Sequence, residues 1–420
     1  MDVSDRSSWR GVKRSKESSR LHTSLDVDVA IIGGGITGIT AAYLLRDSGK
    51  SIALLERENI GDLATGSTTG FLMETLDIDA SELISKYGKE AAQLITKSHR
   101  DAVSRIEEII RQEHIECEFT RCPAYIYART EKQSDDLRKE TGSLREVGTP
   151  VVFSTDSELP FKSCAYIKVK DQAKFHSLKY LFAIADICEQ AGAQIFEHTE
   201  VSKIEKGEIN TVHTKSGHQV HAKHILVATH YPLDPQPAKL RFKKAWYSTY
   251  VLEARLAKHL LPEALFEDIE TPYHYARIDP QPDFDRLIIG GEDHRSDIKI
   301  DEKKSFDALE TYLGEILASV PHTVTRKWKG RIVESADGLA FIGPTTRHKV
   351  FYATAYSGTG LTYGTIAAQL FADFVEGRLN PVAEIYAASR SFSLRQYLPK
   401  AIEYIREFFG AAVKNFFRWD

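Results

Sequence analysis

Residues 27–38 read Val27-Asp28-Val29-Ala30-Ile31-Ile32-Gly33-Gly34-Gly35-Ile36-Thr37-Gly38, a short β-rich apolar run that ends in glycines. Beyond the glycines, apolar residues recur at helical spacing as far as Leu45, which predicts a helix. A second apolar run, residues 51–56, follows the helix stop at Ser48-Gly49-Lys50. The order of strand, tight turn, helix and strand predicts one βαβ unit and a parallel sheet.

The glycines of this turn satisfy the pattern G-x-G-x-x-G in the strand-to-helix context that gives the pattern its meaning. Gly33 permits the tight turn, Gly35 lets the backbone approach a pyrophosphate, and Gly38 lets the helix pack closely on the sheet. The pyrophosphate would lie on free amides at the helix N-terminus. Glu56 ends the second strand, where an acid accepts ribose hydroxyls and repels a 2′-phosphate. The sequence therefore predicts a dinucleotide site that disfavours NADP.

Two further segments favour FAD over NAD. The polar stretch Ala64-Thr65-Gly66-Ser67-Thr68-Thr69-Gly70 can let the backbone run against a flat, phosphate-bearing ligand. Far along the chain, the apolar residues 350–355 lead through Tyr356-Ser357-Gly358-Thr359-Gly360-Leu361-Thr362 into a helix expected to reach about Val375. This second glycine-bearing turn supplies another positive helix N-terminus, which could face the flavin pyrimidine edge where negative charge develops on reduction.

The remaining pattern predicts a second, β-rich unit. We expect helices over residues 89–113 and about 175–190, and strands over residues 247–256, 273–278 and 286–290. The fold class is therefore α/β, an α+β arrangement of two domains: a Rossmann-like FAD-binding domain plus a β-rich substrate domain with flanking helices. We assign residues 25–90, 170–235 and 325–390 to the first, and residues 91–169 and 236–324 to the second.

Composition narrows the class of protein. The 420 residues suffice for two to three domains, and the net charge of −4 argues against a nucleic-acid binder. No apolar run reaches the roughly 20 residues that span a bilayer. The four cysteines show no metal-ligand spacing, so we expect no metal site and a reducing, cytoplasmic location. Residues 1–24 lack an apolar core and are expected to form a flexible or surface-docked arm.

Residues 29–38, Glu56, 65–69, 338–343 and 358–362 together resemble the D-amino-acid-oxidase-like FAD-dependent oxidoreductases of the glycine oxidase and gamma-glutamylputrescine oxidase type. The likeness covers residues 8–390 and looks most like the branch whose members often carry a C-terminal Rieske iron–sulfur domain. It implies that FAD is bound by the following residues: Gly33, Gly35, Ile36, Thr37, Gly38, Glu56, Arg57, Thr65, Gly66, Ser67, Thr68, Thr69, Val201, Thr229, Gly338, Gly358, Thr359, Gly360, Leu361 and Thr362.

Two features depart from the look-alikes. A Rieske centre needs paired Cys and His ligands, yet no cysteine follows Cys188, so we expect no intramolecular electron acceptor. Some relatives attach flavin through a cysteine near the C-terminal turn, and none stands there in this sequence. We therefore expect FAD to be bound non-covalently.

The resemblance also implies oxidation of a carbon–nitrogen bond in a small amine or amino acid, by hydride transfer to the flavin, with molecular oxygen or an electron-carrier protein as acceptor. The candidate catalytic residues are His274, Tyr275, Arg277, Lys329 and Arg331. Alternation along a strand places His274 on one face and the pair Tyr275 and Arg277 on the other. An Arg there could hold a substrate carboxylate through two hydrogen bonds, and a cation near the flavin could assist its reduction.

Residues 391–420 hold apolar positions at helical spacing with basic residues between them, which predicts a C-terminal amphipathic helix. Such a helix packs on its own chain, on a second subunit or on a membrane surface. Two alternatives to an amine or amino-acid oxidoreductase stay open at this point. One is an FAD-stabilised non-catalytic subunit or membrane-surface binding protein. The other is an NAD(P)H-dependent flavin reductase or monooxygenase, which would need a second nucleotide fingerprint or a redox cysteine pair.

Overall fold

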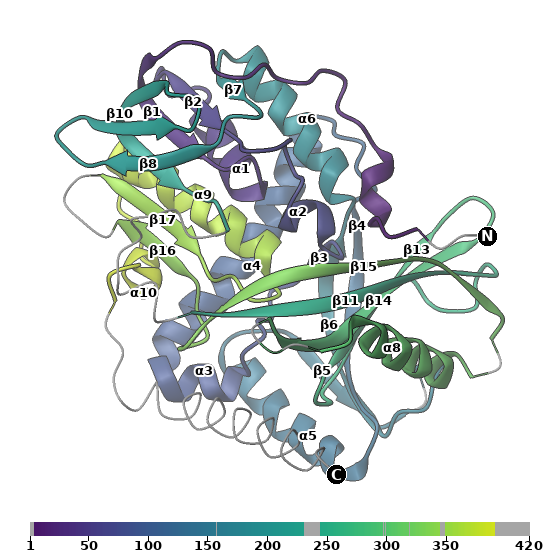
Figure 1. The fold of residues 1–420 in the computed structure, drawn as a ribbon. Helices are drawn as coiled ribbons and strands as arrows, with labels where there is room; N and C mark the ends of the chain where they lie inside the picture. The colour runs from purple at the N-terminus through teal and green to yellow at the C-terminus, as the bar shows by residue number, and fades with distance from the viewer. Residues whose placement is uncertain are drawn as a thin grey trace, which may run out of the picture.

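The computed structural model describes residues 4–390 except 157, 231–243, 297, 299, 319 and 345–348. The predicted helix over residues 391–420 lies outside the described residues. Two sheets dominate the fold, the smaller above the larger in Figure 1, with helices between and around them.

The smaller sheet is the predicted nucleotide-binding one. Its strands lie in the order β16 (Phe341–Pro344), β17 (Val350–Thr354), β10 (Gln219–Val227), β1 (Leu25–Ile32), β2 (Ile52–Leu55) and β7 (Gln194–Phe196), with β9 (Asn210–Thr214) and β8 (Val201–Glu205) joined beside β10. From β17 to β7 the neighbours on this path pair in parallel. Helices α1 (Ile36–Leu45), α6 (Ser177–Gln190) and α9 (Gly360–Glu376) accompany the sheet. The βαβ unit predicted from residues 27–56 is confirmed.

Alternate residues of β1 explain why this sheet is buried on both faces. Val29 and Ile31 belong to the core cluster that includes residues of α1 and α9, while Ala30 and Ile32 pack into the cluster on the other face. A strand buried on both sides reads as an unbroken apolar run, which is the pattern typical of parallel sheets.

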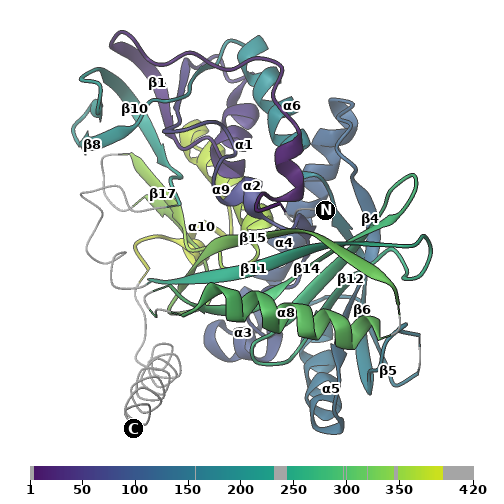
Figure 2. The same ribbon diagram turned by 45° about the vertical axis from the view of Figure 1, so that its right-hand side comes forward.

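The larger sheet is mainly antiparallel. Its order is β15 (His322–Ser335), β11 (Lys244–Leu256), β14 (Asp285–Arg295), β13 (His274–Pro280), β12 (Leu265–Asp268), β4 (Thr120–Ala128), β6 (Ala165–Lys174) and β3 (Phe71–Leu72), with β5 (Val151–Ser154) beside β6. Helix α8 (Glu302–Leu317) covers the face formed by β11 and β14 (Figure 2). The α/β fold class with a Rossmann-like domain and a β-rich unit is confirmed.

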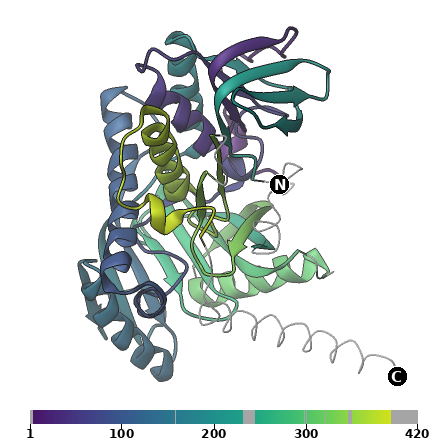
Figure 3. The same cartoon turned by 90° about the vertical axis from the view of Figure 1, so that its left-hand side faces the viewer.

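Five further helices complete the described structure. They are α2 (Ala64–Ser67), α3 (Ala80–Tyr87), α4 (Lys89–Gln112), α5 (Glu131–Glu146) and α10 (Ala383–Tyr386). The long helix α4 packs on α9, and in Figure 3 the smaller sheet lies at the top, with the green strands of the larger sheet below. The helix predicted over residues 89–113 is confirmed. Helices α5 and α8 were not predicted.

The chain crosses between the sheets at places that bear on the domain division. β3 lies in the segment 25–90 but pairs with β6 of the larger sheet. β15 begins just before residue 325 and pairs along its length with β11. The division into two discontinuous domains stays a prediction. Both strands lie in segments assigned mainly to the FAD-binding domain but pair with strands of the larger sheet.

The N-terminal arm lies across both units. Ser4 forms a β-bridge with Arg326 of β15, and Trp9 of the 3₁₀ helix η1 (Ser8–Gly11) is fully buried. Further along, Arg14 forms ion pairs with Asp186 and Glu189 of α6, both at 2.7 Å. Residues 4–24 therefore form a docked arm rather than a flexible one.

Within the described residues, no helix combines the length and the apolar character needed to cross a membrane.

Candidate functional site

The turn between β1 and α1 tolerates no side chain at two of its glycines. Gly33 has φ +114°, and a Cβ there would lie 2.4 Å from the carbonyl oxygen of Ala228. A Cβ on Gly38 would lie 2.0 Å from the carbonyl oxygen of Gly33. Both glycines therefore allow the tight turn and the close helix packing, and neither lines the cavity.

Gly35 differs, because its bare backbone faces an open space. It is the N-cap of α1 and has no side chain to cap the helix. The Thr65 hydroxyl oxygen accepts a hydrogen bond of 3.0 Å from the amide of Ile36. A Cβ on Gly35 would meet only that hydroxyl, at 3.2 Å. This opening gives a pyrophosphate access to the helix amides that remain.

Glu56 lies beside the glycine turn, directly after β2. Its Oε2 accepts a hydrogen bond of 2.6 Å from the amide of Gly34, and its Oε1 accepts one of 2.8 Å from the amide of Glu58. Burial raises the pKa of its carboxyl, against these two amide hydrogen bonds. Each carboxylate oxygen has a further lone pair, so Glu56 is suited to accept ribose hydroxyls.

The second predicted helix start lies next to the first. The Thr37 hydroxyl of α1 and the Tyr356 hydroxyl, just before α9, are 3.1 Å apart. On the other side, Asp77 accepts a hydrogen bond of 2.5 Å from the amide of Gly358. The N-termini of α1 and α9 therefore border the same cavity, although more than 300 residues separate them, as the 319-residue interval between Thr37 and Tyr356 shows.

One cavity is shared by both sheets. Its walls comprise Gly35–Thr37, Ala64, Thr65, Ser67–Thr69, Phe71, Met73, Thr75–Asp77, Ala228, His230, Thr249, Glu267, Tyr273, Tyr275, Asp293, Gly330–Val333 and Ala353–Thr362. Of the residues predicted from sequence, it brings together Gly35, Ile36, Thr37, Thr65, Ser67, Thr68, Thr69, Tyr275, Arg331, Gly358, Thr359, Gly360, Leu361 and Thr362. A flat ligand placed there would lie between the two helix starts and the larger sheet.

Other predicted residues lie outside that wall. Thr229 follows β10, and its amide nitrogen is 3.4 Å from where a Cβ on Gly33 would stand. Val201 begins β8 and is buried in the core on the far face of the smaller sheet. The exposed Arg57 pairs with Glu58 at 3.5 Å.

Gly66 and Gly338 are structural glycines in this fold. A Cβ on Gly66 would lie 2.3 Å from the carbonyl oxygen of Gly61. Gly338 has φ +88°, and a Cβ there would lie 2.8 Å from Ile78. Both positions hold the backbone near the cavity without lining it.

Tyr275 lies on the larger sheet's cavity face, in a space left by a glycine. A Cβ on Gly290 would lie 2.3 Å from Cζ of Tyr275. The Tyr275 hydroxyl reaches the Thr249 hydroxyl at 3.1 Å, and its ring packs edge-on against Phe71 with centroids 5.7 Å apart. Burial raises the pKa of Tyr275 above 10, so the phenol stays protonated at neutral pH.

Arg277 shares that face of the strand but is fully buried outside the cavity wall. Its guanidinium donates to Asp279 at 2.7 and 2.9 Å. It also donates to the carbonyl oxygens of Thr69 at 2.7 Å and Gly70 at 3.0 Å. The structure thus places Arg277 as a clamp on the loop after α2, and a substrate carboxylate would have to displace Asp279 to reach it.

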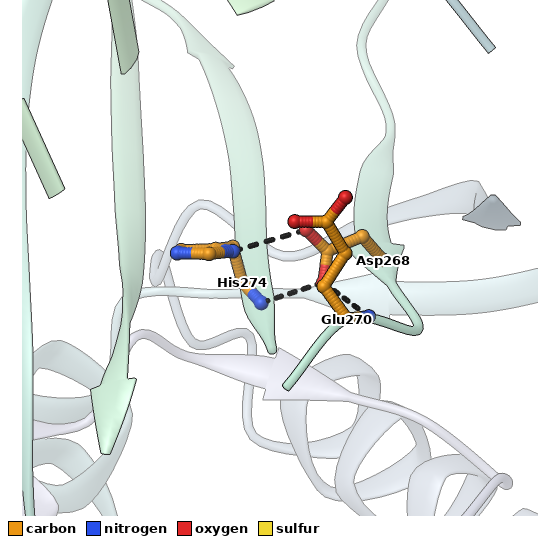
Figure 4. A group of neighbouring side chains, drawn as sticks. All are labelled: Asp268, Glu270 and His274. Atoms are coloured by element: carbon orange, nitrogen blue, oxygen red, sulfur yellow. Dashed lines mark hydrogen bonds and ion pairs between the residues drawn. The ribbon is translucent and has the colours of Figure 1, made fainter. Parts of the chain in front are cut away.

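His274 points to the opposite face of the sheet. Figure 4 shows its Nδ1 directed at Asp268, at 3.0 Å, with Glu270 alongside. Its Nε2 lies 3.1 Å from Glu292, and its ring stacks on Tyr312 with centroids 3.7 Å apart.

Asp268, Glu270 and His274 are close enough to be considered as metal ligands. The surroundings favour a hydrogen-bond network instead. Asp268 accepts from the Tyr312 hydroxyl at 2.6 Å and from two backbone amides, and Glu270 pairs with Arg129 at 3.6 Å. The oxygens of Asp268 and both ring nitrogens of His274 already have hydrogen-bond partners, so this group serves the packing of α8 on the sheet.

Lys329 also lies away from the cavity. Its ammonium pairs with Glu302 of α8 at 2.6 Å, and both side chains are about half exposed. Arg331, two residues on, lines the cavity. Burial lowers the pKa of His230, another wall residue, to about 4, so its imidazole is neutral near pH 7. Arg331 is one of the groups that influence this pKa.

Sequence reasoning missed the carboxyl groups of the cavity. Burial raises the pKa of Glu267 to about 8 and that of Asp293 to about 7. Glu267 comes from β12, a strand that the sequence pattern did not predict. Asp293 follows the glycine pair 290–291, and no motif marked it as a cavity residue. Only the pairing of strands in the larger sheet brings them to one cavity wall.

Comparison with known proteins relates the whole arrangement to one family. The family model described as DAO, FAD dependent oxidoreductase, matches residues 28–374. A protein of Bacillus subtilis that bears the name of a Rieske 2Fe-2S iron–sulfur protein, YhfW, is 29% identical over 390 residues, which cover 91% of this chain and 75% of that protein. Gamma-glutamylputrescine oxidoreductase of Escherichia coli is 24% identical over 374 residues, 85% of each chain.

Among solved structures, glycine oxidase from Geobacillus kaustophilus superposes with a TM-score of 0.74 at 19% identity. The match covers 88% of this chain and 100% of that one. At this identity the likeness establishes the fold. Together with the family match, it accounts for a Rossmann-like sheet that meets a β-rich unit at a shared cavity.

Proposed function

Because this chain belongs to the DAO family of FAD-dependent oxidoreductases, we propose that it oxidises the carbon–nitrogen bond of a small amine or amino acid. FAD, bound non-covalently, supplies the hydride acceptor. The observation that carries the proposal is the shared cavity, in which two helix N-termini face the aromatic wall of the larger sheet. Named relatives that act on glycine and on gamma-glutamylputrescine support this substrate range.

The protein's own groups have distinct tasks in this proposal. The amides at the start of α9 would stabilise negative charge on the bound flavin. Phe71, Tyr273 and Tyr275 would form an aromatic wall that holds the substrate carbon close to the acceptor. The amine must be neutral when the hydride leaves, and the product is an imine that water hydrolyses. Arg331 would supply a positive charge near the flavin that assists its reduction.

The other residues predicted to be catalytic would have positioning or structural roles. Arg277 would position the loop of Thr68 and Thr69 rather than touch substrate, because its hydrogen bonds hold that loop. His274 and Lys329 would maintain the outer side of the sheet through Asp268 and Glu302. Electrons would leave the reduced flavin to molecular oxygen or to an electron-carrier protein.

Anaerobic titration of the FAD-loaded protein tests the proposal. A panel of amines and amino acids should include compounds that bleach the visible flavin band, and readmission of air distinguishes an oxygen acceptor from a protein acceptor. Bleaching by dithionite but by none of the amines would favour a non-catalytic, FAD-stabilised protein. Bleaching by NADPH would favour a reductase. Either outcome overturns the proposal.

A further inference from the structure

The cavity is acidic at the end formed by the larger sheet. Glu267 of β12, Asp293 of β14 and Asp77 before α3 all line it. Asp77 is common to the two others, since its charge contributes to the raised pKa of both Glu267 and Asp293. Carboxyl groups whose pKa is raised in a cavity hold protons that a cationic ligand would release.

The two carboxyl groups on the sheet lack cationic partners among the described residues. No described side chain donates a hydrogen bond to Glu267 or forms an ion pair with it, although Glu267 is only half-buried where it meets the cavity. Asp293 accepts a hydrogen bond of 3.3 Å from the Tyr273 hydroxyl through Oδ2, and the nearby Thr249 hydroxyl also acts to lower its pKa. Its Oδ1 is buried and accepts no hydrogen bond from the residues that the structure describes. A buried carboxylate oxygen without a donor is costly unless a ligand supplies one.

The surrounding groups suit a cation. Tyr273 and Tyr275 stand beside the acids, with ring centroids 5.8 Å apart, and their faces attract positive charge. Arg331 lines the cavity as well, where it influences the pKa of His230. It is not among the main charges that shift the pKa of Glu267 or of Asp293. A substrate carboxylate at this end would meet two acids. A substrate ammonium would meet two acceptors.

Building on the proposed function, we propose that the substrate carries a second ammonium group, besides the amine that is oxidised, and that Glu267 and Asp293 bind it. The substrate class is therefore a diamine or a larger polycationic amine rather than a simple amino acid. The second group stays charged throughout, so it positions the substrate without taking part in hydride transfer.

Three linear probes of matched length test this: a four-carbon diamine, the corresponding monoamine, and the corresponding amino acid. Each is titrated anaerobically into the FAD-loaded protein, recording perturbation of the flavin band for binding and its bleaching for reduction. We expect the diamine to bind roughly 10- to 100-fold more tightly than the monoamine, the range for hydrogen bonds to charged groups. The amino acid should bind more weakly than both.

Variants locate the effect. Glu267→Gln and Asp293→Asn should remove most of the diamine's advantage while leaving the monoamine's binding nearly unchanged. Glu302→Gln, an acid on the outer face that pairs with Lys329, is the matched control and should preserve the preference.

The two readouts separate the possible failures. Selective binding of the diamine without bleaching would overturn the proposed amine oxidation but keep the acidic subsite. Equal binding of the diamine and monoamine, or tighter binding of the amino acid, would overturn the second-ammonium proposal alone. An equal loss of reduction rate for diamine and monoamine in Glu267→Gln would also overturn it, because Glu267 would then act on the reacting amine.

Discussion

The hydroxyl groups of Thr37 and Tyr356 lie 3.1 Å apart and join the start of α1 to the segment that enters α9. Both residues also line the cavity, so this contact fixes the spacing of the two helix N-termini at the proposed FAD site. Burial raises the pKa of Tyr356 above 10, which keeps its phenol available as a hydrogen-bond partner at neutral pH.

Tyr356→Phe should weaken FAD binding by roughly threefold to tenfold, the equivalent of about 0.7–1.4 kcal/mol for one neutral hydrogen bond. Titration of apoprotein with FAD, followed by quenching of flavin fluorescence, measures the change. Tyr386→Phe is the control, because Tyr386 makes a similar hydrogen bond of 2.9 Å to Ser98, away from the cavity wall. Equal weakening in both variants would show a general loss of stability.

Gly35→Val should yield folded but colourless protein. The Val side chain would occupy the opening in front of α1, since its Cβ alone would lie 3.2 Å from the Thr65 hydroxyl. The absorbance of the purified protein near the flavin bands, with and without added FAD, gives the answer. Gly142→Val, in α5 with open space around it, controls for the effect of a new Val. A yellow, fully loaded Gly35→Val protein would contradict the pyrophosphate assignment.

Gly290→Ala should displace Tyr275 from the cavity wall, because the new Cβ would lie 2.3 Å from its Cζ. We expect an altered visible spectrum of bound FAD and a raised KM for any substrate. Tyr275→Leu shortens the side chain that the new methyl group meets. The double variant should therefore be less impaired than the sum of the two single changes. Strict additivity would indicate that Tyr275 does not lie across Gly290.

Arg277→Met should lower the free energy of unfolding by about 3–5 kcal/mol, because it leaves Asp279 partly uncompensated in the interior. Lys174 and Arg286 also contact Asp279, which places the expected loss toward the lower end of that range. Lys329→Met breaks an exposed pair and should cost at most about 1 kcal/mol. Urea unfolding of the FAD-loaded variants measures both values. A small loss for Arg277→Met would contradict its role as a clamp.

Glu267→Gln should change how stability depends on pH. Burial raises the pKa of Glu267 from its usual 4.5 to about 8, so the folded chain retains a proton that the unfolded chain releases between these pH values. This contribution to stability is full below pH 4.5 and is lost as the pH rises through about 8. Glutamine cannot ionise. The melting temperature of the variant relative to wild type should therefore rise from acid to alkaline pH, and a constant difference would contradict the shift.

The parts of the fold predicted from sequence depend on local patterns. The βαβ unit and the long helix α4 follow from apolar spacing over short windows. Helix α8 has few apolar residues outside its sheet-facing side, and β15 is mostly half-exposed, so neither stood out. Both owe their structure to packing against β11.

The site shows the same division. The two glycine-bearing turns identified the helix starts, because glycine patterns report backbone geometry directly. Alternation correctly grouped Tyr275 with Arg277 on one face of β13. It could not show that Arg277 is occupied by Asp279 and by carbonyl oxygens from residues 69 and 70, more than 200 positions away. The cavity carboxyl groups of Glu267 and Asp293 were not predicted, because they too are brought together only by contacts between distant segments.

The docked arm has a consequence for how the chain is completed during synthesis. Ser8 donates a hydrogen bond of 2.5 Å to Glu253, and the β-bridge of Ser4 needs Arg326. Ser4 and Ser8 therefore reach their places only after Glu253 and Arg326 have been synthesised. Because Ser8 and Glu253 are 245 positions apart, docking of this arm is a late step in the assembly of the chain.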